Sequence, residues 1–228
     1  GCTNTIGSYR CICPEGYTLH KNNHNCTKGD CFYEISSPFG RIQSPKYPDV
    51  YPNRKTCVWK FTTLPGHRVC VSFLFFRVEY QEECFYDRVE LYDGLSSGDR
   101  TLGKFCGDRL PEPLTSSGTD LYMTFKTDAS TQRKGFWGTY STVCGGVLQA
   151  ETREKYIYSH VQFGVGNYGN DIDCTWIVKA DYGFGVRLAF SSFDIEDDVD
   201  CLYDYVEIFS EKKSNSFARG RYCGNVVS

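Results

Sequence analysis

Short runs in which apolar residues alternate with polar or small ones recur along most of the chain. Val69–Phe73 (VCVSF) and Val186–Phe190 (VRLAF) alternate in this way, which is typical of half-buried β-strands. Arg88–Gly94 (RVELYDG) indicates a strand that ends in an Asp-Gly turn, and Leu121–Lys126 (LYMTFK) indicates another strand. Clusters of Gly, Pro and Ser separate these runs, and no helical periodicity of useful length occurs. The pattern predicts an all-β fold built from two-sheet sandwiches of about 100 residues each.

The pattern occurs twice along the chain. Cys57 and Trp59 recur 117 positions later as Cys174 and Trp176. Further pairs at the same offset are Glu79 and Glu196, Cys84 and Cys201, Asp87 and Asp204, and Cys106 and Cys223. One shared offset indicates a duplicated domain, with a first copy over residues 31–142 and a second over residues 144–228. Adding 117 to position 136 exceeds the 228 residues of the chain, so we expect the second copy to be truncated, without its final strands.

Cysteine usage indicates the environment of the protein. Residues 1–30 hold few apolar residues and many Cys, Asn, Gly and Thr, so this segment needs covalent cross-links to fold. The chain has 13 cysteines and one methionine, which predicts a secreted protein in an oxidising, extracellular setting. Structural zinc is the alternative use of cysteine, but no CxxC pair occurs.

Charge and hydropathy exclude two other classes of protein. The net charge of −3 gives no basic face for nucleic acid. The longest apolar run, Val69–Phe76, is too short to span a membrane. The chain opens on GCTNTIGSYRC, in which no secretory signal is recognisable.

Three carboxylates of the first copy fall at strand ends. Glu79 follows a strand, Asp87 opens the next, and Asp128 ends another. At one end of a sandwich they repel one another unless a cation joins them, and calcium suits such oxygen donors. The site would keep about one negative charge for a partner's lysine or arginine, and Tyr86 would contact the stem of that side chain. A solvated acidic rim is the alternative.

The second copy repeats part of this set. Glu196, Asp204 and Tyr203 recur, but the counterpart of Asp128 would be position 245, beyond the last residue. No HExxH, GxSxG or glycine-rich phosphate loop occurs, and the four histidines are scattered, so this chain carries no recognisable catalytic motif.

The segment Cys2–Cys13 (CTNTIGSYRCIC), followed by Pro14, Gly16 and Cys26, resembles the second half of a calcium-binding EGF-like module. The family pattern C-x-[DN]-x4-[FY]-x-C-x-C is filled by Asn4, Tyr9, Cys11 and Cys13. The resemblance implies that Asn4 supplies a side-chain calcium ligand and that Thr5 and Ser8 supply backbone oxygens.

Everything after Cys31 resembles CUB domains: paired cysteines, C-x-W, Phe-x-x-Glu, Cys-x-Tyr-Asp-x-Val-Glu and a late Cys-Gly. Five segments are similar to the tolloid and bone morphogenetic protein-1 family of astacin-type metalloproteinases: Pro65–Val69, Thr131–Phe136, Cys144–Gly146, Tyr158–Gly164 and Tyr203–Phe209. The CUB resemblance implies the same ligands, Glu79, Asp87 and Asp128, with a backbone oxygen near Ser130.

The same resemblance implies a disulfide pattern. The pairs are Cys13–Cys26, Cys31–Cys57, Cys84–Cys106, Cys144–Cys174 and Cys201–Cys223. Cys2 and Cys11 are then expected to pair with cysteines upstream of this chain. Cys70 has no place in the pattern, and the equivalent position of the second copy is Arg187. We therefore expect Cys70 to be a free thiol that points outward.

The resemblance implies a non-catalytic, calcium-dependent substrate-recognition region of a secreted zinc metalloendopeptidase. The zinc would lie only in a catalytic domain outside this chain, and the partners would be procollagens and growth-factor antagonists such as chordin. An endocytic receptor or matrix binding protein without a protease is one alternative, and a complement-type serine protease, which also joins CUB and EGF-like modules, is another.

Overall fold

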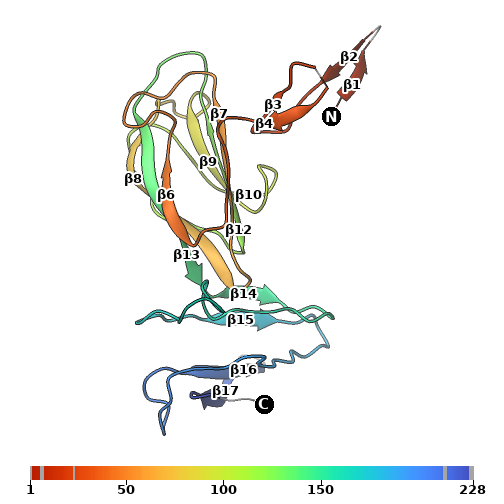
Figure 1. The fold of residues 1–228 in the computed structure, drawn as a ribbon, viewed down its shortest axis with the longest axis vertical. Helices are drawn as coiled ribbons and strands as arrows, with labels where there is room; N and C mark the ends of the chain where they lie inside the picture. Colours follow the sequence, from red (N-terminus) through yellow and green to blue (C-terminus); the bar gives the residue numbers. More distant parts are fainter. Residues whose placement is uncertain (1, 6–7, 23, 213–214, 226–228) are drawn as a thin grey trace. The chain divides into compact units, whose positions relative to one another are not determined.

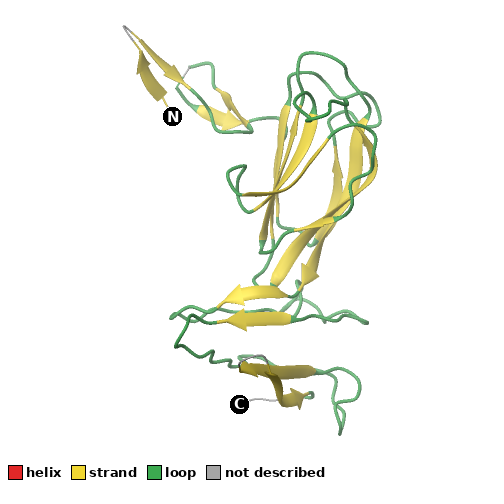
Figure 2. Cartoon of the chain, turned by 180° about the vertical axis from the view of Figure 1, so that it is seen from behind, coloured by secondary structure: helices red, strands yellow, loops and turns green. Residues whose placement is uncertain are grey.

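The computed structural model describes residues 2–5, 8–22, 24–212 and 215–225. These residues form strands and loops but no helix, as Figure 2 shows, which confirms the all-β prediction. None of the described segments is a helix that could cross a membrane. The chain divides into two compact units, Gly1–Asp181 and Tyr182–Ser228.

The EGF-like segment consists of two short antiparallel hairpins (Figure 1). The first pairs β1 (Cys2–Thr5) with β2 (Ser8–Cys11), and the second pairs β3 (Tyr17–Leu19) with β4 (Cys26–Lys28). The structure joins Cys13 to Cys26 and Cys2 to Cys11. The Cys2–Cys11 bond corrects the expectation that these two cysteines have partners upstream of this chain. The hairpin register sets Cys2 directly opposite Cys11, and the structure bonds the two sulfur atoms.

The first CUB domain is a sandwich of two sheets (Figure 1). The five-stranded sheet has the order β10-β9-β12-β7-β5, and the four-stranded sheet has the order β11-β8-β13-β6. The strands are β5 (Phe32–Ile35), β6 (Phe39–Gln43), β7 (Thr56–Thr62), β8 (His67–Arg77), β9 (Arg88–Asp93), β10 (Arg100–Phe105), β11 (Leu114–Thr115), β12 (Asp120–Lys126) and β13 (Gly135–Cys144). Val69–Phe73, Arg88–Gly94 and Leu121–Lys126 therefore correspond to β8, β9 and β12, with Gly94 alone falling outside its strand. β13 extends to Cys144, two residues past the predicted boundary at 142, because it pairs with the first residue of β8.

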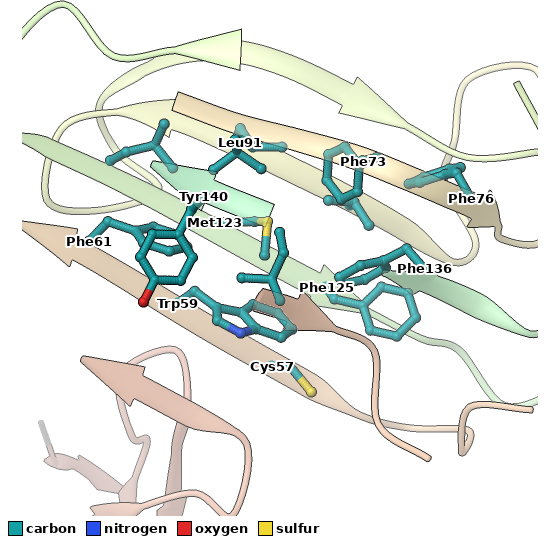
Figure 3. Close-up of a cluster of buried hydrophobic side chains, with 14 of the residues drawn as sticks. Cys57, Trp59, Phe61, Phe73, Phe76, Leu91, Met123, Phe125, Phe136 and Tyr140 are labelled. Carbon is teal, nitrogen blue, oxygen red and sulfur yellow. The ribbon is translucent and has the colours of Figure 1, made fainter. Parts of the chain in front are cut away.

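Alternation along the strands explains the core between the sheets. Phe136 of β13 is fully buried, and its ring lies 5.3 to 6.4 Å from the rings of other core aromatics. Those neighbours are Trp59, Phe73, Phe76 and Phe125 (Figure 3). Truncating such a residue to alanine costs about 3–5 kcal/mol. The core is therefore an aromatic cluster contributed by both sheets.

Two disulfides close the first CUB domain, Cys31–Cys57 and Cys84–Cys106. Cys70 on β8 is a free cysteine and is partly buried. Its strand neighbours are Ser141 of β13 and Thr115 of β11.

The second repeat has fewer strands than the first. β14 (Gly146–Gln149) and β15 (Trp176–Lys179) form a parallel pair, and β16 (Val206–Lys212) and β17 (Asn215–Tyr222) form an antiparallel pair. The structure joins Cys144 to Cys174 and Cys201 to Cys223.

The predicted strand Val186–Phe190 is wrong, because these residues form a loop in which the apolar side chains are exposed. Its equivalent in the first copy, β8, pairs along its whole length with β13. Among the described residues, Val186–Phe190 pairs with no neighbouring strand. An isolated strand has no ladder to stabilise it.

Candidate metal centre

The structure brings Glu79, Asp87 and Asp128 together at one end of the sandwich. One carboxylate oxygen of each lies within 4.8 Å of the others. It is the one group of this kind among the residues that the structure describes. Glu79 lies just past β8, Asp87 just before β9, and Asp128 just after β12. Strands from both sheets therefore deliver the three carboxylates.

Asp87 is the buried member of the group, with 0% of its surface exposed. Its Oδ1 accepts a 2.7 Å hydrogen bond from the backbone N–H of Asp128. Its Oδ2 and the Oε2 of Glu79 are buried without a hydrogen-bond partner. Buried carboxylate oxygens without a donor are costly unless a cation compensates them. The residues present therefore fit a hard divalent cation that takes oxygen ligands, such as calcium.

Burial and like charge act together on these carboxyl groups. Burial raises the pKa of Asp87. Hydrogen bonds from the Tyr51 hydroxyl and from the backbone N–H of Asp128 oppose this rise, whereas the negative charge of the Asp128 side chain adds to it. Burial likewise raises the pKa of Glu79; a hydrogen bond from Thr131 opposes this, and the charges of Asp87 and Asp128 add to it. In the absence of a cation Asp87 and Glu79 therefore bind protons more readily than ordinary carboxyl groups do.

Tyr51 organises the site, although the sequence analysis did not single it out. Its side chain is fully buried, with the ring edge-on to Phe125 at 5.1 Å. Its hydroxyl accepts a 3.0 Å hydrogen bond from the backbone N–H of Glu79, and its own backbone N–H donates to the carbonyl of Arg133. Burial, followed by the neighbouring Asp87, raises the pKa of the Tyr51 hydroxyl, so it stays neutral. Tyr51 thus ties the start of the Glu79 loop to the loop after Asp128.

A signal for Tyr51 does exist in the sequence. Tyr168 stands 117 positions further on, at the offset of the duplicated landmarks. Asn53, whose side-chain amide donates to the carbonyl of Ala129 at 2.9 Å, has its counterpart in Asn170 at the same offset. Both residues hold the loop that follows Asp128.

The other predicted residues of the first CUB domain lie around this group. The backbone N–H of Ser130 donates to Oδ1 of Asp128 at 2.8 Å, so Ser130 closes the loop at the site. Tyr86, next to Asp87, is 50% exposed. Tyr80, which follows Glu79 and was not predicted, is 73% exposed. Aromatic side chains are therefore open to solvent next to two of the three carboxylates.

The remaining predicted ligands are not gathered in the same way. Glu196, Tyr203 and Asp204 are exposed in the second repeat, and no third carboxylate joins Glu196 and Asp204 among the described residues. In the backbone register of the first hairpin, Asn4 pairs with Tyr9 and Thr5 pairs with Ser8. Asn4 is exposed there.

Comparisons with known proteins identify the modules of the chain. The CUB domain family model matches residues 31–140 and 144–228, and the complement Clr-like EGF-like model matches residues 8–27. Tolloid-like protein 1 of Mus musculus is 45% identical over 98% of this chain and 22% of its own length. The dorsal-ventral patterning protein tolloid of Drosophila melanogaster is 44% identical over 98% of this chain and 21% of its own length.

Among solved structures, the chain resembles the MASP-1 CUB2 domain bound to Ca2+, at 28% identity and a TM-score of 0.44, over 48% of this chain and 96% of that one. The chain spans about a fifth of the length of its tolloid relatives. The family models that match this chain describe modules of two kinds, EGF-like and CUB, and neither describes a catalytic domain. The chain therefore belongs to the CUB domain family, as an EGF–CUB–CUB segment of the tolloid type.

Proposed function

We propose that this chain is the calcium-dependent, non-catalytic substrate-recognition region of a secreted, tolloid-like zinc metalloendopeptidase. The observation that carries the proposal is the carboxylate group Glu79, Asp87 and Asp128, with its buried oxygens that lack hydrogen-bond donors. Calcium bound there would leave about one negative charge at the surface of the domain. A lysine or arginine of a partner would neutralise that charge.

The surroundings of the group supply a second element of recognition. The exposed rings of Tyr80 and Tyr86 flank Glu79 and Asp87 in the sequence, and Phe85 is 67% exposed beside Tyr86. Aromatic faces attract cationic groups and pack against the aliphatic stems of lysine and arginine. A basic segment of a procollagen or of a chordin-like antagonist is a partner of this chemistry.

Surface plasmon resonance tests the proposal. The chain is passed over an immobilised procollagen or chordin-type protein, with calcium or with EDTA, and at two salt concentrations. Binding should require calcium and weaken at higher salt, because exposed charge pairs are screened over about 8–10 Å. Tyr86→Ala should weaken partner binding and leave calcium binding intact, whereas Asp128→Ala should reduce both.

A matched control is Tyr156→Ala, which removes another exposed tyrosine, 57% accessible and remote in the sequence from the carboxylates. It should change neither measurement. Binding that is indifferent to EDTA and salt would place the partner elsewhere and contradict the proposal.

A further inference from the structure

The middle of the outer face of the five-stranded sheet, which points away from the core, is buried although no second layer of CUB strands covers it. Residues at alternate positions of β7, β9 and β12 form this face, and Thr124 lies between Val58 and Glu90 in the ladder. Val58 and Thr124 are 0% exposed, Tyr122 is 4% exposed and Tyr92 is 7% exposed. An uncovered sheet face carries exposed side chains, so another part of the chain covers this one.

The cover is a tight turn of the EGF-like segment. The backbone N–H of Tyr17 donates to the carbonyl of Pro14 at 3.0 Å, and Gly16 between them has a φ of +79°. A Cβ on Gly16 would lie 2.8 Å from Val58 and 2.5 Å from the ring of Phe32. The backbone of the turn therefore rests directly on the sheet, at a distance that only glycine permits.

Aromatic contacts enlarge the interface between this turn and the sheet. The ring of Tyr17 meets Phe32 edge-on at 5.1 Å, and Phe32 packs against the cluster of Val58, Tyr92 and Tyr122. The joint therefore has an apolar centre that is excluded from water.

A chain of charges lines the joint. Oε1 of Glu15 pairs with Nζ of Lys126 at 2.6 Å, and Oε2 of Glu15 accepts a 3.2 Å hydrogen bond from the hydroxyl of Tyr122. Lys126 also lies 3.7 Å from Glu90, which pairs with Arg88 at 3.3 Å. The side chains of Glu15 and Lys126 are only 20% and 28% exposed. A partly buried, hydrogen-bonded ion pair of this kind fixes the relative position of its two side chains more tightly than an exposed ion pair does.

We propose that the EGF-like module and the first CUB domain form one rigid unit, in which the Glu15–Tyr17 turn is seated on the outer face of the five-stranded sheet. Lys126 is the last residue of β12, two positions before Asp128, and Arg88 is the first residue of β9, directly after Asp87. The contact between this turn and the sheet therefore fixes the direction of the EGF-like module relative to the carboxylate group. None of the contacts described above involves Glu79, Asp87 or Asp128, so the joint can be tested separately from calcium binding.

Backbone ¹⁵N relaxation of the whole chain at constant calcium tests the joint. Amides of residues 15–28 should share one rotational correlation time with amides of β7 and β12. Lys126→Met and Glu15→Gln should each cause a loss of that shared value, and Glu15→Lys combined with Lys126→Glu should restore it. Glu151→Gln, which breaks an exposed ion pair with Arg153 and Lys155 in the second repeat, is the matched control and should change nothing.

Gly16→Val should separate the modules most strongly, because its side chain cannot fit against Val58. The chemical shifts of the variants report whether each module stays folded, so the charge variants test the joint even if Gly16→Val misfolds. Independent tumbling of residues 15–28 in the parent chain would overturn the proposal. A shared correlation time that survives in Lys126→Met and Glu15→Gln would overturn it as well.

Discussion

The hydroxyl oxygen of Tyr51 accepts a hydrogen bond from the backbone N–H of Glu79, 28 positions along the chain, at 3.0 Å. Tyr51→Phe keeps the buried ring and leaves that N–H without its acceptor. We expect the free energy of unfolding to fall by about 1–2 kcal/mol, and calcium binding to weaken because Glu79 loses its anchor. Urea unfolding and calorimetric titration with calcium measure the two effects.

Tyr33→Phe is the control for this substitution. Tyr33 stacks on Trp59 but is 43% exposed, and its hydroxyl takes part in none of the hydrogen bonds described above for Glu79, Asp87 and Asp128. Equal stability and equal calcium affinity in Tyr51→Phe and Tyr33→Phe would contradict the organising role of Tyr51.

Calcium binding should weaken on acidification at a higher pH than ordinary carboxylate sites show. Burial raises the pKa of Asp87 and of Glu79 in the ion-free protein. The folded, ion-free state then binds protons more tightly than the unfolded state, so it gains relative stability as the pH falls, whereas calcium binding loses strength. The melting temperatures with calcium and with EDTA should therefore differ most near neutral pH and converge as the pH is lowered into the acid range. A constant difference over that range would count against the carboxylate group as the calcium site.

His67 should make the protein less stable in mild acid. It is 4% exposed at the start of β8, and burial lowers the pKa of its imidazole; the carbonyl of Pro65 opposes this effect, and His160 adds to it. The unfolded state therefore takes up a proton below about pH 6.5 that the folded state resists, so stability falls as the pH drops through that value.

The urea midpoint of the parent should thus fall more between neutral pH and mild acid than that of His67→Leu. His20→Leu, at an exposed position of the EGF-like segment, should behave as the parent does. An identical pH dependence of the parent and His67→Leu would show that another group is responsible.

Local pattern and the internal repeat predicted much of the first CUB domain. β8, β9 and β12 follow from alternation, and Glu79, Asp87 and Asp128 fall at strand ends that the two sheets bring together. The internal repeat also pointed to Tyr51, because Tyr168 stands at the common offset of 117 positions. It was missed because a buried tyrosine in a loop has no periodic pattern.

Other features depend on contacts that sequence patterns do not carry. The ion pair of Glu15 with Lys126 joins residues more than a hundred positions apart in different modules. Val186–Phe190 does alternate apolar and polar or small residues, but a strand also needs a neighbouring strand, and none of the residues that the structure describes pairs with this stretch. Cys2 and Cys11 were assigned by resemblance to distant partners, whereas the hairpin register places them opposite each other.

The most direct test is a calorimetric calcium titration of the chain, with Asp87→Asn compared with the parent. Asp87→Asn keeps the size of the buried side chain and removes the charge, so the chain should bind one equivalent of calcium fewer. Glu82→Gln, an exposed carboxylate three residues past Glu79, should bind as the parent does. Asp87→Asn that binds calcium with the stoichiometry and affinity of the parent would contradict the assignment of Glu79, Asp87 and Asp128 as a calcium site.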